Sequence, residues 1–259
     1  MTPEIALKAF LEQLDPSRRS ALLELASPHT RSALAALPSY TLAPPSEDPF
    51  PNIHWSWFLP HLKGLSPFEQ SCCLAVVSCP QLTVSPATLT SLGRDFISQY
   101  LFQPLSDGYI PLAWLPPSQL LPLTHMPKRQ LEALIDHLAL LDLAVALRQI
   151  VDTKRLKQIQ AQLTETQLQH LKHLATSADP SPYPILELDK IHDLHAHLHR
   201  RGLLHLAAAL SRESPALLWH VAHRLDIGRG TLLCKLAEEV PPSLAAWSSD
   251  KILSFFPKI

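Results

Sequence analysis

The stretch SPALLWHVAHRLDIGRGT, residues 214–231, decides how the rest of the chain is interpreted. Ser214-Pro215 is a typical helix start, with a hydroxyl cap before a proline at the first helical position. Leucine, valine and alanine residues then recur at helical spacing as far as Leu225 and form one apolar stripe. Gly228 and Gly230 are typical of a turn, and a second apolar helix follows at once. The stretch predicts two helices joined by a glycine turn.

Similar helix signals recur along the whole chain of 259 residues. Glycine is scarce at 6 residues, proline is abundant at 25, and β-branched and aromatic residues form no alternating runs. This composition favours helices separated by proline breaks over strands. We therefore expect an all-α fold, an irregular helical array with armadillo-like helix pairs in the C-terminal half.

Proline and serine clusters divide the chain into four predicted segments. These are an N-terminal three-helix unit (1–37), a proline-rich linker (38–52), a helical sub-domain that begins with an aromatic segment (53–122) and the C-terminal helical array (123–259). Within the array we expect separate helices over 127–140 and 141–150. A further helix over 187–201 is expected to end at Gly202.

The charge balance argues against several classes of partner. Lys and Arg number 22 and Asp and Glu number 23, a net charge of -1, whereas nucleic-acid binders carry a clustered basic excess. No polybasic run favours direct membrane binding. The longest nearly apolar run, 138–147, contains Asp142 and is too short to span a bilayer, and the N-terminus does not resemble a signal peptide. We expect a soluble cytoplasmic protein that binds no nucleic acid.

A histidine-rich helix provides the candidates for a metal site. His195 and His199 stand four residues apart and could hold one metal ion from a helix face, with His192 or Asp193 as a third ligand. Neither an HExxH motif nor a Cys/His zinc spacing occurs. We therefore predict no metal site, no cofactor and no enzymatic activity.

The dipeptide His192-Asp193 nevertheless resembles the motif of the HD-type metal-dependent phosphohydrolases. In that family a histidine, a His-Asp pair and a distant aspartate converge on metal. Here the resemblance implies roles for His170 or His173, for His192-Asp193 and for Asp226. This hydrolase is the alternative to a non-enzymatic function.

Three tryptophans are candidate contacts for a protein partner. Trp55 and Trp57 lie in the segment IHWSWFLPHLKG (53–64), where they and Phe58 cannot share one helical face. Trp219 lies within the decisive stretch. Aromatic residues that lie off an apolar stripe are the usual hot spots of protein interfaces.

Two resemblances suggest a function. The sequence SRESPALLWHVAHRLDIGRGTLLCKLAEE (211–239) resembles the armadillo-like modules of the flagellar switch protein FliG. Residues 53–240, including IHWSWFLPHLKGLSPFEQ, resemble the K-type (SctK/YscK-like) accessory components of bacterial type III secretion systems. The resemblance implies a cytosolic scaffold that links platform and membrane-ring subunits. Its partners would be other secretion-apparatus proteins, with the membrane reached only through a ring protein, and a homo-oligomer is compatible with it.

Overall fold

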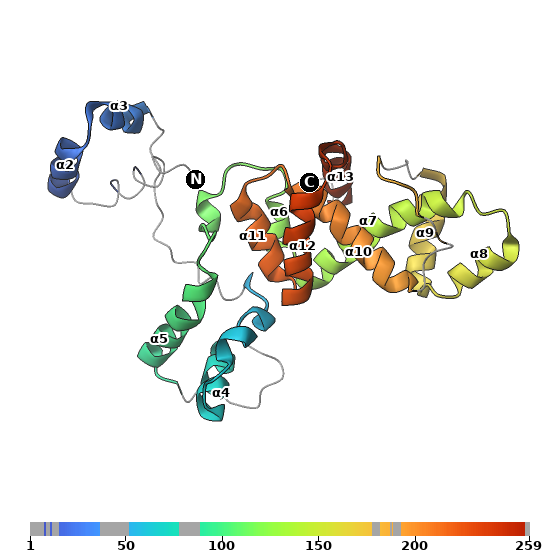
Figure 1. The fold of residues 1–259 in the computed structure, drawn as a ribbon, viewed down its shortest axis with the longest axis horizontal. Helices are drawn as coiled ribbons and strands as arrows, with labels where there is room; N and C mark the ends of the chain where they lie inside the picture. The colour runs from blue at the N-terminus through green and yellow to red at the C-terminus, as the bar shows by residue number, and fades with distance from the viewer. Residues whose placement is uncertain are drawn as a thin grey trace. The chain divides into compact units, whose positions relative to one another are not determined.

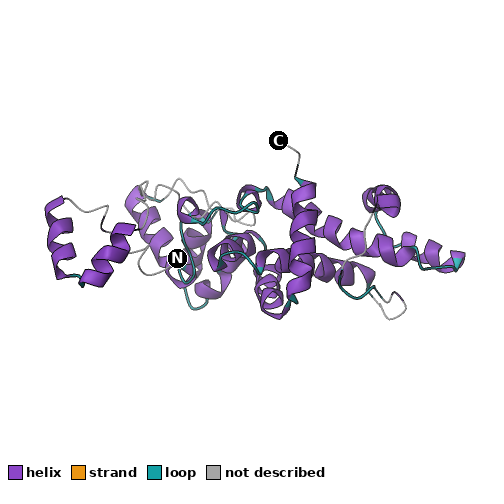
Figure 2. Cartoon of the chain, turned by 90° about the horizontal axis from the view of Figure 1, so that it is seen from above, coloured by secondary structure: helices purple, strands orange, loops and turns teal. Residues whose placement is uncertain are grey.

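The computed structural model describes residues 8, 11, 16–36, 52–77, 89–177, 182–186, 188 and 193–256. Within these ranges every regular element is a helix and no strand occurs (Figure 2). The predicted all-α fold is therefore confirmed. None of the described helices is long and apolar enough to cross a lipid bilayer.

Backbone contacts divide the chain into two compact units. Met1–Asp48 with Pro111–Trp114 form the first unit, and Pro49–Ile110 with Leu115–Ile259 form the second. Among described residues, the second unit thus unites most of the predicted sub-domain (53–122) with the predicted array (123–259). The aromatic segment contacts helices of the array through Trp57 and Ser56.

The first unit contains two helices within the predicted N-terminal unit, α2 (Pro16–Leu25) and α3 (Pro28–Ala36). The Ser27 hydroxyl caps α3 by accepting the N–H of Thr30 at 3.1 Å. The predicted first helix lies almost wholly outside the described residues, of which Lys8 and Leu11 are helical. The predicted linker (38–52) also lies outside them, except for Asn52.

The central helix of the second unit is α10 (Leu194–Leu210) (Figure 1). It packs against α7 (Lys128–Leu147), α12 (Ile227–Glu239) and α13 (Pro242–Phe255). Every residue from 201 to 210 is buried, as expected for a helix that organises a core. The other helices of this part are α6 (Pro122–His125), α8 (Thr153–Gln160), α9 (Glu165–Ser177), which packs on α7, and α11 (Pro215–Arg224), which packs on α12.

The predicted armadillo-like pairing is not confirmed. In a solenoid each helical repeat contacts its neighbours in sequence. Here α7 packs mainly on α10, although α8 and α9 lie between them in the chain. Three described helices that are separated in the chain, α7, α12 and α13, therefore pack round one central helix.

Gly202 lies inside α10 and does not end a helix, so that prediction is wrong. A Cβ atom at this position would lie 2.0 Å from the carbonyl oxygen of Ile135 in α7. The glycine therefore allows the backbones of α7 and α10 to cross closely. α7 is likewise one continuous helix where the sequence predicts two, since nothing within 128–147 interrupts its buried face.

The stretch 214–231 forms two helices as predicted, but the glycines do not make the turn. The Ser214 hydroxyl accepts the Leu217 N–H at 3.2 Å, which confirms the predicted cap. α11 ends at Arg224 and α12 begins at Ile227, so both glycines lie in the first turn of α12. A Cβ atom at Gly230 would lie 2.4 Å from the carbonyl oxygen of Ala222, so this glycine is needed for close packing.

A buried ionic cluster connects α10 to α7 and α13. Asp142 of α7 accepts hydrogen bonds from Nε of Arg201 and, at 2.8 Å, from Nε2 of His205. Nδ1 of His205 lies 3.2 Å from the hydroxyl of Ser248 in α13. Burial alone raises the pKa of Asp142, but the hydrogen bonds and charges of His205 and Arg201 outweigh burial and lower it. The core thus holds an ionised carboxylate with its partners.

Candidate protein-binding groove

The aromatic segment lies across the junction between α11 and α12. It contains two 3-10 turns, η2 (Trp55–Trp57) and η3 (Leu59–Leu62). The His54 N–H donates to the carbonyl of His223 at 2.7 Å, and the Ser56 hydroxyl accepts the Ile227 N–H at 2.9 Å. The Trp57 indole N–H donates to the carbonyl of Leu225 at 2.9 Å. Hydrogen bonds therefore attach this segment to the interhelical turn.

Trp57 and Trp219 enclose the imidazole of His223. Their ring centroids lie 4.1 Å and 3.9 Å from that of His223, in stacked orientations. Nδ1 of His223 donates to the carbonyl oxygen of Trp219 at 2.8 Å. Burial lowers the pKa of His223 to about 4, so the ring is neutral at pH 7.

The structure corrects the predicted surface role of Trp219 and leaves Trp55 and Trp57 partly accessible. Trp219 is only 9% exposed and belongs to the interior, so it is not a surface contact for a partner. Trp55 and Trp57 are half-buried against a hydrophobic cluster that includes Phe58 and Leu101. The large rings thus contribute buried apolar area to the protein's own core.

The predicted metal candidates form no metal site among the described residues. His192 lies outside them, His195 is exposed and His199 is half-buried. Asp193 caps α10 by accepting the Ala196 N–H at 3.0 Å, and Asp226 caps α12 by accepting the Arg229 N–H at 3.2 Å. Both carboxylates considered for a phosphohydrolase site therefore serve as helix caps.

His170 and His173, the other histidines considered for a phosphohydrolase site, lie on α9. His170 pairs with His137 of α7, with 2.9 Å between Nε2 of His170 and Nδ1 of His137, and His173 is exposed. Burial lowers the pKa of His137 to about 4. This pair joins two packed helices.

The structure reveals a different candidate site, formed by α4 (Pro67–Val76) and α5 (Ser91–Phe102), which pack together. Ser66 and Glu69 form a capping box, in which the Glu69 carboxylate accepts the Ser66 N–H at 2.7 Å. Thr90 caps α5 by accepting the Gly93 N–H at 3.1 Å. The caps satisfy donors that each helix start leaves unpaired. The inward faces, with Cys73 and Leu101, join the hydrophobic cluster.

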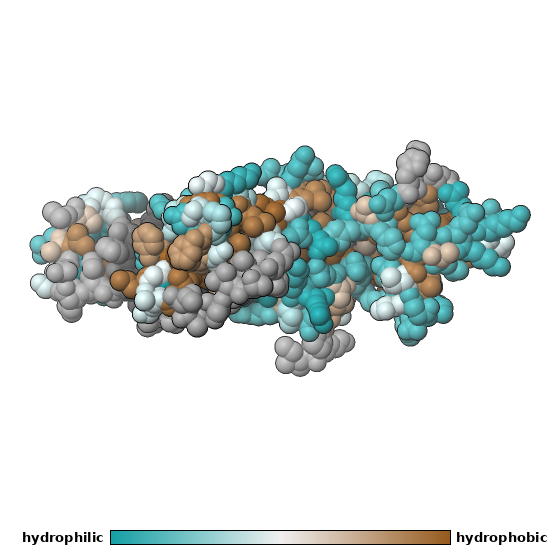
Figure 3. All heavy atoms as spheres, turned by 90° about the horizontal axis from the view of Figure 1, so that it is seen from below, coloured by the Kyte–Doolittle hydropathy of each residue, from teal (hydrophilic) through white to brown (hydrophobic). Residues whose placement is uncertain are grey.

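A second apolar face of the same helices is exposed to solvent. Phe68 is 78% exposed on α4, and Leu92 and Phe96 are 79% and 70% exposed on α5. Tyr100, at 45%, continues the line of α5, because residues four apart share a helix face. Phe68, Phe96 and Tyr100 line a groove of about 420 Å³. Figure 3 shows hydrophobic side chains, in brown, at the surface where α4 and α5 lie.

Comparison of the chain with protein-family models, curated proteins and solved structures found no match.

The size of the exposed face matches that of a protein interface. A large aromatic side chain carries about 150–250 Å² of surface, so Phe68, Leu92, Phe96 and Tyr100 together expose about 500 Å². A standard interface covers about 800 Å² on each partner, of which somewhat more than half is apolar. The exposed face therefore suffices for the apolar part of one interface.

The groove has little capacity for catalysis. Glu69 is the charged residue among the described side chains that line it, and hydrogen bonds from Ser66 lower its pKa. Burial raises the pKa of the Cys73 thiol, which keeps it protonated and weakly nucleophilic. The arrangement offers apolar shape for binding and no paired acid and base.

The sequence does contain a signal for this groove. In SLGRDFISQYLF (91–102), one apolar set is Leu92, Phe96 and Tyr100, and a second set is Ile97 and Leu101. A helix on the surface of a monomer needs one apolar face, whereas α5 carries a second apolar set that is exposed. None of the three candidate tryptophans lies on α4 or α5.

Proposed function

We propose that the protein is a non-enzymatic scaffold or adaptor subunit that binds another protein in the α4–α5 groove. The exposed face formed by Phe68, Leu92, Phe96 and Tyr100 carries this proposal. Contiguous apolar patches of this size on soluble proteins commonly mark interaction sites. An amphipathic helix with apolar residues at i, i+3, i+4 and i+7 is a suitable ligand for such a groove.

The resemblance to K-type secretion components supports a more specific version of the proposal. The protein would be a cytosolic subunit of a type III secretion or flagellar-type apparatus. Its partners would be platform and membrane-ring subunits of that apparatus. The all-helical fold is compatible with this role.

Co-purification with candidate platform and ring subunits tests the proposal. The tagged full-length chain is expressed together with these subunits as wild type and as the variants Phe96→Ser and Phe68→Ser. Each variant removes an exposed aromatic ring, so we expect at least about a tenfold loss of partner binding and no loss of helical content.

Leu22→Ser is the matched control, because Leu22 is an exposed leucine of α2, 41% accessible and outside the groove. We expect it to retain the partner. Equal retention of partner by all three variants would contradict binding at the groove. Recovery of no platform or ring subunit with the wild type would contradict the secretion-apparatus assignment.

A further inference from the structure

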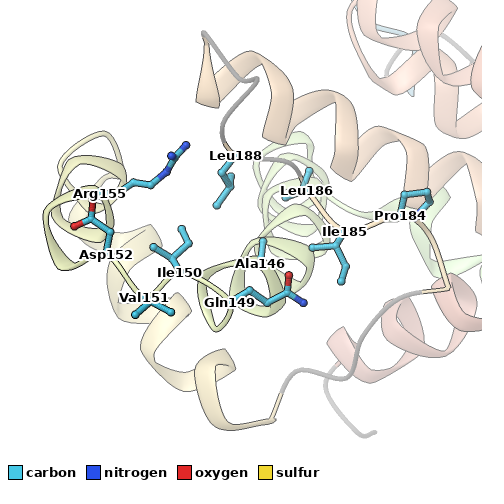
Figure 4. Close-up of a pocket in the computed structure, with 10 residues that line it drawn as sticks. All are labelled: Ala146, Gln149, Ile150, Val151, Asp152, Arg155, Pro184, Ile185, Leu186 and Leu188. Carbon is cyan, nitrogen blue, oxygen red and sulfur yellow. The ribbon is translucent and has the colours of Figure 1, made fainter.

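A second concave site lies between the end of α7, the start of α8 and residues 184–186 and 188. It is a cleft of about 720 Å³. Figure 4 shows its two walls. Ile150, Val151 and Arg155 belong to one wall, and Ile185, Leu186 and Leu188 belong to the other.

One wall is held in place by the ionic cluster of the core. Arg201, which bonds to Asp142, also donates to the carbonyl oxygen of Pro184 at 2.6 Å. The guanidinium carbon of Arg201 lies over the ring of Tyr183, 4.2 Å from the ring centroid. Leu186 is buried. A wall fixed in this way costs little conformational entropy when a ligand binds.

Val151 leaves its apolar side chain exposed to solvent. It precedes Asp152, which caps α8 by accepting the Lys154 N–H at 2.8 Å. An apolar residue before the cap commonly packs on the fourth helical residue, here Leu156. Val151 is instead 95% exposed at the cleft, and Ile185 on the opposite wall is 45% exposed. Both walls thus present apolar side chains to solvent.

The wall formed by α8 is basic. Arg155 lines the cleft, and Lys154 and Lys157 are exposed on the same short helix. Asp152 also lines the cleft, and its carboxylate accepts the backbone N–H of Lys154 in the cap. The helix itself, TKRLKQIQ, contains no acidic residue, so its charge is wholly positive. A complementary ligand therefore combines apolar side chains with negative charge.

We propose that this cleft is a second docking site and takes an acidic amphipathic peptide segment of a partner protein. Its apolar residues contact Val151 and Ile185, and its carboxylates face α8. The concave form fits a peptide better than a membrane surface. The three basic residues of α8 are also fewer than the clusters of 4–8 that recruit proteins to anionic lipid. This site makes the protein bivalent and does not depend on a ligand in the α4–α5 groove.

Fluorescence anisotropy with designed peptides tests the proposal on the full chain. The probe is a labelled helical peptide with leucine on one face and glutamate on the other, and a second peptide carries lysine in place of glutamate. We expect the glutamate peptide to bind at least about fivefold more tightly than the lysine peptide. Val151→Ser is expected to weaken binding of the glutamate peptide about tenfold, and Lys154→Glu is expected to weaken it about fivefold.

Three controls make the outcome decisive. Lys154→Glu places an acidic residue in the first turn of α8, which favours the helix, so lost binding would not report lost folding. Lys235→Glu alters an exposed lysine of α12 and should change the dissociation constant less than about twofold. Phe96→Ser should leave peptide binding unchanged, which separates this site from the proposed groove.

Equal affinity for the two peptides, or binding unaffected by Val151→Ser and Lys154→Glu, would overturn the proposal. Sedimentation with phosphatidylserine vesicles that depends on Val151 would also overturn it, in favour of a membrane site.

Discussion

At the scale of single residues, close packing requires one glycine within a helix and leaves room for a side chain at another. A Cβ atom at Gly202 would meet the backbone of Ile135 at 2.0 Å, whereas at Gly228 the nearest atom would be Oδ1 of Asp226 at an ordinary 3.4 Å. We expect Gly202→Ala to lower the free energy of unfolding by about 2–3 kcal/mol, because α7 and α10 must separate. Gly228→Ala should raise it by about 0.5 kcal/mol, since alanine loses less entropy in a helix. Urea titrations compare both variants with the wild type. A neutral Gly202→Ala would contradict the close crossing.

His223 makes the stability of the protein dependent on pH. Its pKa is about 4 in the folded protein and near 6.5 as a free side chain. Because the unfolded chain binds the proton more tightly, this contribution is present above pH 6.5 and is lost as the pH falls toward 4. Between pH 7 and pH 5 we expect a loss of about 2 kcal/mol from this residue.

The variant His223→Phe isolates this effect, because it keeps an aromatic ring between Trp57 and Trp219 but cannot titrate. Its free energy of unfolding should fall about 2 kcal/mol less than that of the wild type over the same pH range. Other histidines, such as His137, contribute equally to both proteins. Identical pH dependence of the two proteins would show that His223 is not the titrating group.

At the scale of the elements, the sequence predicts well the features that depend only on neighbouring residues. The Ser214 cap depends on neighbouring residues, and the structure confirms it. The roles of Gly202 and Gly230 depend on helices distant in sequence, so no local pattern distinguishes them from glycines that end a helix. The burial of Trp219 depends equally on the distant Trp57 and His223. The exposed face of α5 is the exception, since its two apolar sets are visible in the sequence.

At the scale of the whole molecule, the two units lead to a prediction about truncation. The central helix α10 and its contacts with α7, α12 and α13 all lie in the second unit. Removal of residues 1–48 should therefore leave amide protection in α7 and α10 unchanged, as expected for independent regions. Exchange should become faster at Pro111–Trp114, which belongs to the first unit. Hydrogen-exchange mass spectrometry of the full chain and of residues 49–259 makes this comparison. Faster exchange throughout α10 would contradict the division.

The attachment of the aromatic segment to the interhelical turn also has a consequence for synthesis on the ribosome. The indole of Trp57 and the carbonyl of Leu225 are separated by 168 positions in the chain. At about 5–20 residues per second, translation of that interval takes roughly 10–30 s. Throughout this time Trp55, Trp57 and Phe58 have been synthesised but their C-terminal partners do not yet exist. The nascent chain therefore presents a strongly apolar segment of the kind that molecular chaperones bind, and its folding is completed only near the end of translation.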